Sequence, residues 1–372
     1  MKKTLLATAI AGAMVASGAQ AATIYNQDGT KLDLYGNIQI AYRSIEKNVA
    51  DAGDPRDVQS QDDLFDNGST VGLSGEHVIN PGLTGYFKAE WEHDVDEAKD
   101  AGGIDTGDQA YMGLKGNFGD ARVGSWDPLI DDWIQDPITN NEYFDASDSS
   151  SYSFSTEHKA KREGNKLSYT SPSLAGFQFA VGTQYEGDAE GENLTDSGNA
   201  SAFGGLKYSA GAFSVAAVYD NLDNYQAEFD DGSDYELGEQ YGITAQYAWN
   251  TLRVSAKVER FESDNTDLID DANFYALGAR YGYGNGMGDI YGAYQYVDVG
   301  GGKLLDALDD AATGGDSPSD LNEDRGDDSY NEIVLGATYN VSDAMYTFVE
   351  AAWYDREDDE KDGVAVGAVY MF

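Results

Sequence analysis

The chain has 372 residues, no cysteine, and 67 acidic against 23 basic residues, which gives a formal net charge of −44. The lack of cysteine excludes disulfides, thiolate metal sites and cysteine nucleophiles, and the charge makes nucleic acid a very poor partner, because phosphate contacts need clustered Lys and Arg. No run of 18 apolar residues follows the N-terminal region, so the pattern is not that of a helical membrane protein.

The first residues have the pattern of a secretory signal peptide. Lys2 and Lys3 precede an apolar stretch over 5–15, and Ala19-Gln20-Ala21 has the small-x-small form of a cleavage site. An uncleaved anchor is the alternative, but this apolar stretch is too short to span a bilayer. We therefore expect residues 1–21 to be a signal peptide and 22–372 to be the exported domain.

Apolar and polar residues alternate along most of the remaining chain. In 31–43, for example, Leu32, Leu34 and Ile38 share one face, and Asp33 and Asn37 share the other. The same period of two recurs in 241–249, 252–259 and 333–341. Such alternation indicates β-strands with one apolar and one polar face.

The alternation predicts 16 strands. They span 31–43, 69–78, 84–94, 107–116, 119–126, 162–171, 176–185, 200–208, 212–220, 238–249, 252–261, 272–283, 289–297, 329–340, 345–355 and 363–372. Seven short connections alternate with eight longer ones, which is typical of an antiparallel transmembrane β-barrel with short turns at one rim and long loops at the other. A soluble β-sandwich also alternates, but it would have shorter and fewer strands.

Aromatic residues on the predicted apolar faces favour the membrane barrel. They lie near strand ends, where Trp and Tyr prefer the bilayer interface; they are Tyr42, Trp249, Tyr281, Tyr339 and Trp353. The last strand alternates up to a terminal Phe372. This ending is similar to the insertion signal of outer-membrane barrels.

The long loops carry most of the negative charge: their ranges hold 50 of the 67 acids. Solvated surface is the simplest interpretation, and adaptation to a salty habitat is a second. Diffuse binding of Ca²⁺ or Mg²⁺ is a third, because hard carboxylate oxygens suit both ions, although no EF-hand pattern is present. We expect no cofactor and no defined metal site, but a strongly negative outer mouth that concentrates cations.

Several segments resemble the general diffusion porins of Gram-negative bacteria, of the OmpC/OmpF type. They are ATIYNQDGTKLDLYG at 22–36, LSGE at 73–76, LTGY at 83–86, GLKGNFG at 113–119 and SYTSPSLAGF at 168–177. The resemblance implies a homotrimer in the outer membrane, in contact with lipid and lipopolysaccharide. It also implies a 16-stranded barrel around a water-filled pore for small hydrophilic solutes and cations, narrowed by an inward-folded third long loop.

Porins of this family place loop acids across the pore from wall bases, and such charged rings set ion selectivity. In the third long loop, 127–161, the candidate acids are Asp127, Asp131, Asp132 and Asp136. Arg162 aligns with a wall arginine of the family, and strand phase adds Arg43, Lys88 and Arg122. Asn37, Thr70 and Asp108 stand where the family has bases, and the loop lacks the usual Pro-Glu-Phe-Gly-Gly motif. Because these departures leave fewer bases and more acids, we predict a preference for cations.

A barrel hydrolase and a sugar-specific porin are the two alternative functions. A barrel hydrolase would need a nucleophile oriented by histidine, but His77, His93 and His158 have no serine motif beside them. A sugar-specific porin would need contiguous aromatic residues in its lumen, and the 26 tyrosines leave that alternative open. We therefore expect a channel without enzymatic activity.

Overall fold

The structure is a computed structural model of the chain. It describes residues 21–48, 58–97, 104–134, 142–146, 164–185, 200–222, 226–228, 234–236, 238–264, 271–300, 329–355 and 361–372. The predicted signal peptide, apart from Ala21, lies outside these residues. Within the described residues, no helix is both long and apolar enough to cross a membrane.

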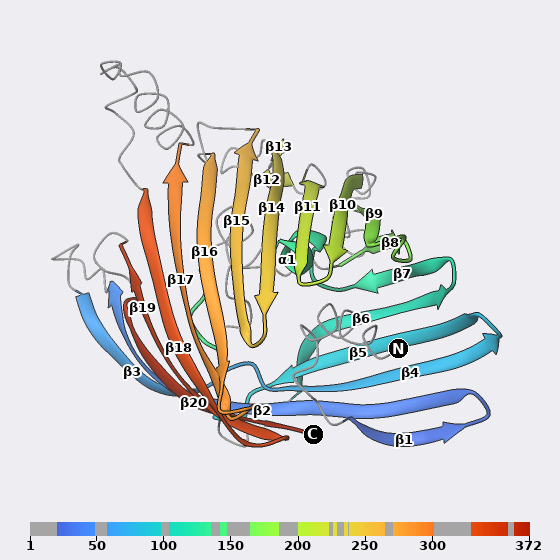
Figure 1. Cartoon of the computed structure of the whole chain (residues 1–372), viewed down its shortest axis with the longest axis horizontal. Helices are drawn as coiled ribbons and strands as arrows, with labels where there is room; N and C mark the ends of the chain where they lie inside the picture. Colours follow the sequence, from blue (N-terminus) through green and yellow to red (C-terminus); the bar gives the residue numbers. More distant parts are fainter. Residues whose placement is uncertain are drawn as a thin grey trace.

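One continuous antiparallel sheet forms the wall of the molecule (Figure 1). Its strands are β1 (Ala22–Gln27), β2 (Thr30–Asn48), β3 (Val58–Asp66), β4 (Thr70–Asn80), β5 (Leu83–His93), β6 (Ile104–Gly116), β7 (Gly119–Ser125), β8 (Lys166–Thr170), β9 (Phe177–Tyr185), β10 (Ala200–Ala210), β11 (Phe213–Asn221), β14 (Gly238–Trp249), β15 (Leu252–Ser263), β16 (Ala272–Tyr283), β17 (Gly288–Val299), β18 (Tyr330–Ser342), β19 (Met345–Tyr354) and β20 (Gly363–Met371). Outside it lie the helix α1 (Leu129–Trp133) and a small hairpin of β12 (Gln226–Glu228) and β13 (Asp234–Glu236).

The sheet closes on itself at β2. One edge of β2 pairs with β20 from Asn37 to Ile45, and the chain end continues this pairing through two backbone hydrogen bonds between Phe372 and Gly36. The other edge pairs with β4 and then with β3, so these two segments form one interrupted strand. The hairpin strand β1 extends the β20 edge. The described sheet is therefore a closed barrel with 16 strand positions, which confirms the predicted fold.

The two faces of the barrel wall differ as the alternation predicts. Large apolar side chains point outward, including Ile243, Val258 and Leu277 near the middle of their strands. All five predicted interface aromatics are also exposed on this outer face: Tyr42, Trp249, Tyr281, Tyr339 and Trp353. An apolar band with aromatic borders is the exterior that a lipid bilayer requires. The inner face carries polar side chains such as Gln240, Thr244, Lys257 and Glu332.

All seven predicted short turns are present, and each predicted strand overlaps an observed one. The turn at Asn250 and Thr251, for example, places Asn250 at φ 54°, a conformation that asparagine tolerates better than most residues. The prediction of a loop over 44–68 is wrong in part, because β2 continues to Asn48 and β3 covers Val58–Asp66. This extension carries polar residues on both faces, so it lacks the alternation that identifies a half-buried strand.

A charge on the outer face tests the membrane-spanning orientation. Leu277 is 62% exposed near the middle of β16. The substitution Leu277→Arg is expected to destabilise the folded barrel by about 2–4 kcal/mol, because folding then transfers a charged guanidinium from water into the hydrocarbon near the bilayer midplane. Urea unfolding of the protein in lipid vesicles measures this cost. The control Leu277→Val is expected to cost less than about 1.5 kcal/mol, and equal stability of all three proteins would contradict the orientation.

Candidate constriction of the lumen

The chain enters the lumen directly after β7. Trp126 is buried, and the helix α1 follows at Leu129–Trp133. The apolar side of this helix packs on the inner face of β9, β10 and β11, where Leu129, Ile130 and Ile134 form a cluster with Ala180, Phe203, Ala216 and Val218. The first part of the third long loop therefore lies against the inner wall.

Two glycines on that wall make the close packing of α1 feasible. A Cβ at Gly205 would lie 2.9 Å from the ring of Trp133, and a Cβ at Gly242 would lie 2.8 Å from Ile134. Both distances are shorter than a carbon–carbon contact allows, because the optimal separation is about 3.5–4.0 Å. The absence of side chains at these two positions lets the loop approach the sheet.

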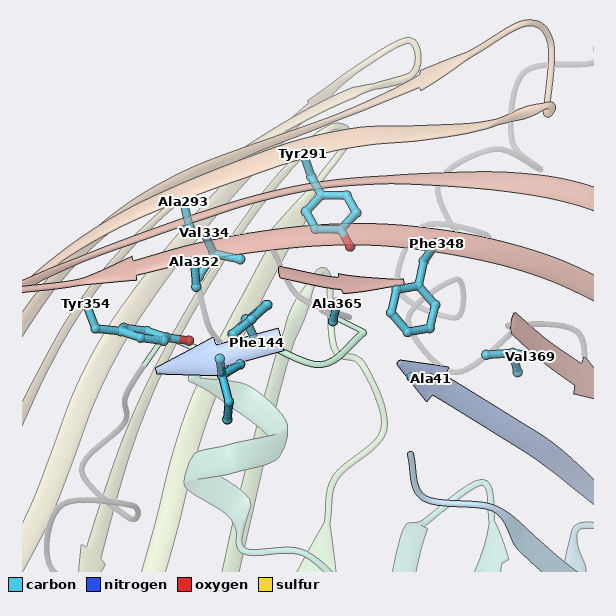
Figure 2. Packing of buried hydrophobic residues seen from close by; sticks show 11 residues of the cluster. Ala41, Phe144, Tyr291, Ala293, Val334, Phe348, Ala352, Tyr354, Ala365 and Val369 are labelled. Carbon is cyan, nitrogen blue, oxygen red and sulfur yellow. The ribbon is translucent and has the colours of Figure 1, made fainter. Parts of the chain in front are cut away.

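The loop contacts the wall a second time at 142–146, on a different arc of the barrel. Phe144 is buried in an apolar cluster on the inner face of β2 and β17–β20 (Figure 2). Its neighbours in this cluster include Tyr291, Phe348 and Tyr354. Tyr143 packs edge-on against both Phe65 and Phe144, with ring centroids 5.1 and 4.7 Å apart. The loop thus has two wall contacts, one on β9–β11 and one on β2 and β17–β20.

A single carboxylate fixes the second contact. Glu350, on β19, accepts hydrogen bonds from the backbone N–H groups of Glu142, Tyr143 and Phe144 at 2.7–2.9 Å. The hydroxyl of Tyr291 donates to the same carboxylate. Because Glu350 is buried, these four donors replace the water that an ionised carboxylate otherwise needs.

Glu142 brings a second carboxyl group to this contact. It accepts a hydrogen bond from the hydroxyl of Tyr346 at 2.8 Å. Burial, and the nearby Glu350 and Asp289 carboxylates, raise the pKa of Glu142 to about 7, although Tyr346 and Arg280 act in the opposite direction. Protonation of Glu142 near neutral pH therefore reduces the repulsion between two adjacent carboxylates.

Three of the four predicted loop acids lie in the described part of the loop. Asp127 accepts a hydrogen bond from Gln109 at 2.8 Å, and Asp132 lies 3.8 Å from the guanidinium of Arg122. Asp131 is the neighbour of Asp132 on α1. Enclosure by the barrel and the Asp127 carboxylate raise the pKa of Asp132 to about 6, although Arg122, Lys166 and Lys207 act in the opposite direction. Asp136 lies outside the described residues.

Of the predicted wall bases, Arg122 is the one that meets these acids. Its guanidinium lies over the ring of Trp126, 4.3 Å from the centroid, and over Tyr111 at 5.2 Å. Arg43 and Lys88 also face the lumen, and each has its own acidic neighbour: Arg43 lies 3.2 Å from Asp63, and Lys88 lies 3.1 Å from Glu90. Arg43 also donates to the hydroxyl of Tyr143 in the loop at 3.0 Å, and Lys88 donates to Gln109, which in turn donates to Asp127. Arg162 lies outside the described residues.

Two lysines that the sequence pattern did not single out also lie at this level of the lumen. Lys166 donates to the backbone oxygen of Trp126 at 2.7 Å, and Lys207 lies over the ring of Trp133, 5.7 Å from its centroid. Their positions on the polar faces of β8 and β10 could have marked them as lumen residues. Their level along the barrel could not be inferred, because it depends on where α1 packs.

No group of three or more acidic or histidine side chains is arranged for metal binding among the described residues. The acidic ranges for which we expected diffuse Ca²⁺ or Mg²⁺ binding lie largely in the parts of the long loops that the structure leaves undescribed.

Substitution of Glu350 tests whether this side chain holds segment 142–146 on the wall. Glu350→Ala removes the acceptor of four hydrogen bonds, and each hydrogen bond to a charged group is worth about 1.5–3 kcal/mol. We expect segment 142–146 to leave the wall, and a spin label on Asp145→Cys to become mobile in electron paramagnetic resonance spectra. The chain has no other cysteine, so the label is specific.

Tyr291→Phe is the matched control for Glu350→Ala, because it removes one hydroxyl donor and leaves the three backbone hydrogen bonds in place. Its label is expected to stay immobile. A mobile label in the protein that carries only Asp145→Cys and retains Glu350 would mean that Glu350 does not hold the loop.

Comparison with known proteins agrees with this architecture. Residues 7–359 match the family model described as Gram-negative porin. A protein named "Monosaccharide porin" from Halomonas sp and the "Major outer membrane protein" of Halomonas elongata are each 63% identical to this chain, over all of both chains. "Outer membrane porin F" of Salmonella typhi is 25% identical, again over all of both chains.

Solved structures show the same fold. The chain superposes on Salmonella typhi OmpF, in a structure described as a complex with daunomycin, with a TM-score of 0.67 and 22% identity, covering 94% of this chain and all of that one. It superposes equally well on the anion-selective porin from Comamonas acidovorans, with a TM-score of 0.67 and 19% identity, covering 92% of this chain and all of that one. The apolar exterior, the closed barrel and these relatives identify an outer-membrane channel of a Gram-negative bacterium and not an enzyme: the chain belongs to the Gram-negative porin family.

Proposed function

We propose that this porin is a trimeric channel through which small hydrophilic solutes diffuse, and that it prefers cations. The trimer is supported by the resemblance to the OmpC/OmpF type. The cation preference is supported by the charges of the lumen, and the observation that carries it is the position of Asp127 and Asp132 beside the bases of the wall.

Most charged bases of the described lumen have a carboxylate within 4 Å. Besides Arg122 with Asp132, these pairs are Arg43 with Asp63, Lys88 with Glu90, Lys257 with Glu259, Arg260 with Asp271 and Arg280 with Asp289. A base paired in this way contributes little field to the pore. At the level of α1 the acids Asp127, Asp131 and Asp132 balance the bases Arg122, Lys166 and Lys207, so the constriction has no excess of positive charge that would repel cations. The net charge of −44 favours cations at longer range.

Asparagine substitutions test the acids of the constriction. Asp131→Asn combined with Asp132→Asn is expected to lower the ratio of cation to anion permeability about two- to fourfold, because one charge at roughly 10 Å in water is worth about 0.4 kcal/mol. Reversal potentials in planar bilayers under a KCl gradient measure this ratio. Asp343→Asn, which removes one acidic charge from the short turn between β18 and β19, is the matched control and should leave the ratio unchanged.

The same measurement has an expected pH dependence. Because the pKa of Asp132 is raised to about 6, its negative charge is present above pH 6 and is lost as the pH falls through that value. Cation preference should therefore weaken between roughly pH 7 and pH 5. Asp132→Asn should reduce this transition and leave the part contributed by Glu142, whose pKa is about 7. An anion-preferring channel at pH 7.5, or unchanged selectivity in the double variant, would reject the acidic constriction.

Passage of monosaccharides is the second candidate function. It is favoured by the printed name of the 63% identical relative, "Monosaccharide porin". The described lumen also holds adjacent aromatic rings, since Tyr86, Tyr111 and Trp126 are in edge-to-face contact at 6.2 and 5.9 Å. Arg122 and Lys115 lie over these rings, and Trp126 is buried, so the rings hold cations and do not form an open sugar track. Diffusion therefore remains the proposed mechanism of passage.

We also propose that residues 1–21 are a signal peptide that is removed on export. The pattern of Lys2, Lys3 and Ala19-Gln20-Ala21 supports this cleavage. Intact mass spectrometry of the protein from outer membranes should give a chain that begins at Ala22. A chain that retains Lys2 and Lys3 would contradict the proposal.

A further inference from the structure

A polar cavity lies in the barrel wall next to the constriction, on the side of the short turns. Its volume is about 330 Å³, and it is formed by the inner faces of β7, β8 and the start of β9. Six polar side chains line it: Asp120, Arg122, Ser168, Thr170, Ser171 and Gln178. Ligand pockets in proteins have volumes of about 300–1,000 Å³, so this cavity has room for one small molecule.

Strand register explains why these side chains converge. Asp120 pairs with Thr170, and Arg122 pairs with Ser168, in the antiparallel ladder between β7 and β8. Directly opposed residues on one face of a sheet have Cβ atoms about 4.5–5.5 Å apart. A carboxylate, a guanidinium and two hydroxyls are therefore grouped on one patch of the inner wall.

Neighbouring groups hold the lining in place. The hydroxyl of Tyr86 donates to Asp120, and Gln178 donates its Nε2 to the backbone oxygen of Ser171 at 3.0 Å. The hydroxyl of Ser171 donates to the oxygen of Pro172 and accepts from the N–H of Phe179, each at 3.0 Å. These contacts preorganise the cavity, and preorganisation reduces the entropy that a ligand must overcome.

The charges of the cavity select the class of ligand. Asp120 and Arg122 have opposite signs, so the lining carries no net charge and offers no advantage to a free cation or anion. The Asp120 carboxylate accepts hydrogen bonds, the Arg122 guanidinium donates them, and the hydroxyl and amide groups of the lining do both. Adjacent hydroxyl groups of a neutral polyol match such a mixed lining.

The cavity lies next to α1, on the path that a solute takes through the lumen. Arg122 belongs to both places, because it lines the cavity and also lies 3.8 Å from Asp132 on α1. A solute that passes α1 toward the short-turn rim therefore meets the cavity next.

We propose that this cavity is a weak binding subsite for a neutral monosaccharide during its passage through the pore. The proposal rests on the proposed function, since a subsite in the wall requires that solutes traverse the lumen. Ser168, Thr170 and Gln178 contact the sugar hydroxyls, while Asp120 and Arg122 orient them.

D-glucose is the probe for this subsite. In proteoliposomes, radiolabelled glucose uptake by the unchanged porin is expected to saturate with concentration. The double variant Ser168→Ala with Thr170→Val removes two hydroxyls from the lining and leaves Arg122 and Asp132 in place. It should raise the half-saturating concentration at least about fivefold, because each hydrogen bond is worth about 0.5–1.5 kcal/mol.

Ser255→Ala is the matched control, because it removes one hydroxyl from the inner face of β15, away from the cavity. It should keep the half-saturating concentration of the unchanged porin. KCl conductance of all three proteins should be equal, which shows that the pore is intact.

Three results would overturn the proposal. Glucose uptake that rises linearly in the unchanged porin, with normal conductance, would reject the subsite and leave the diffusion channel standing. Saturation with the same half-saturating concentration in the double variant would place binding outside the cavity. Absence of conductance in the unchanged porin would reject the proposed function itself.

Discussion

Every backbone N–H and C=O group in the hydrocarbon core of a membrane needs a partner from the protein, because no water is present there to supply one. In this porin the closed sheet meets that requirement. The pairing of β2 with β20, continued by Phe372 and Gly36, joins the first and last strands and leaves no open edge between them. Closure also separates the two sides of every strand, so that one set of alternating side chains faces lipid and the other faces the lumen.

The lumen is shaped by a loop that has little secondary structure of its own. Its described parts depend on the wall for their position: α1 lies against Gly205 and Gly242, and segment 142–146 is held by Glu350 and the cluster around Phe144. Buried carboxylates are costly unless they are paired or hydrogen-bonded. Here the cost is offset because Glu350 satisfies three backbone donors that would otherwise lack partners in the same place.

Most bases of the lumen wall are paired with one acid each, whereas Arg122 has several further contacts. Bases such as Arg43 and Lys88 each lie beside an acid, so their fields largely cancel at a distance. Arg122 differs because it connects three features: the acid on α1, the rings of Trp126 and Tyr111, and the cavity between β7 and β9. The proposed ion preference and the proposed sugar subsite therefore both involve the guanidinium of Arg122, although different measurements test them.

The amino-acid sequence by itself determined most of the strands, the barrel and its apolar exterior. Lipid on one side of the wall and water on the other require apolar and polar residues to alternate, and this alternation can be read directly from the sequence. It also placed Arg43, Lys88 and Arg122 on the inner face, since strand phase alone decides that. It did not reveal β3, whose residues Gln61, Asp62 and Asp63 are polar on both faces. Only the tertiary structure decided which lumen residues meet the loop. Lys166, Lys207 and Glu350 gained their contacts from the path of a loop across the barrel, and that path depends on packing between residues as many as 210 positions apart, such as Phe144 and Tyr354.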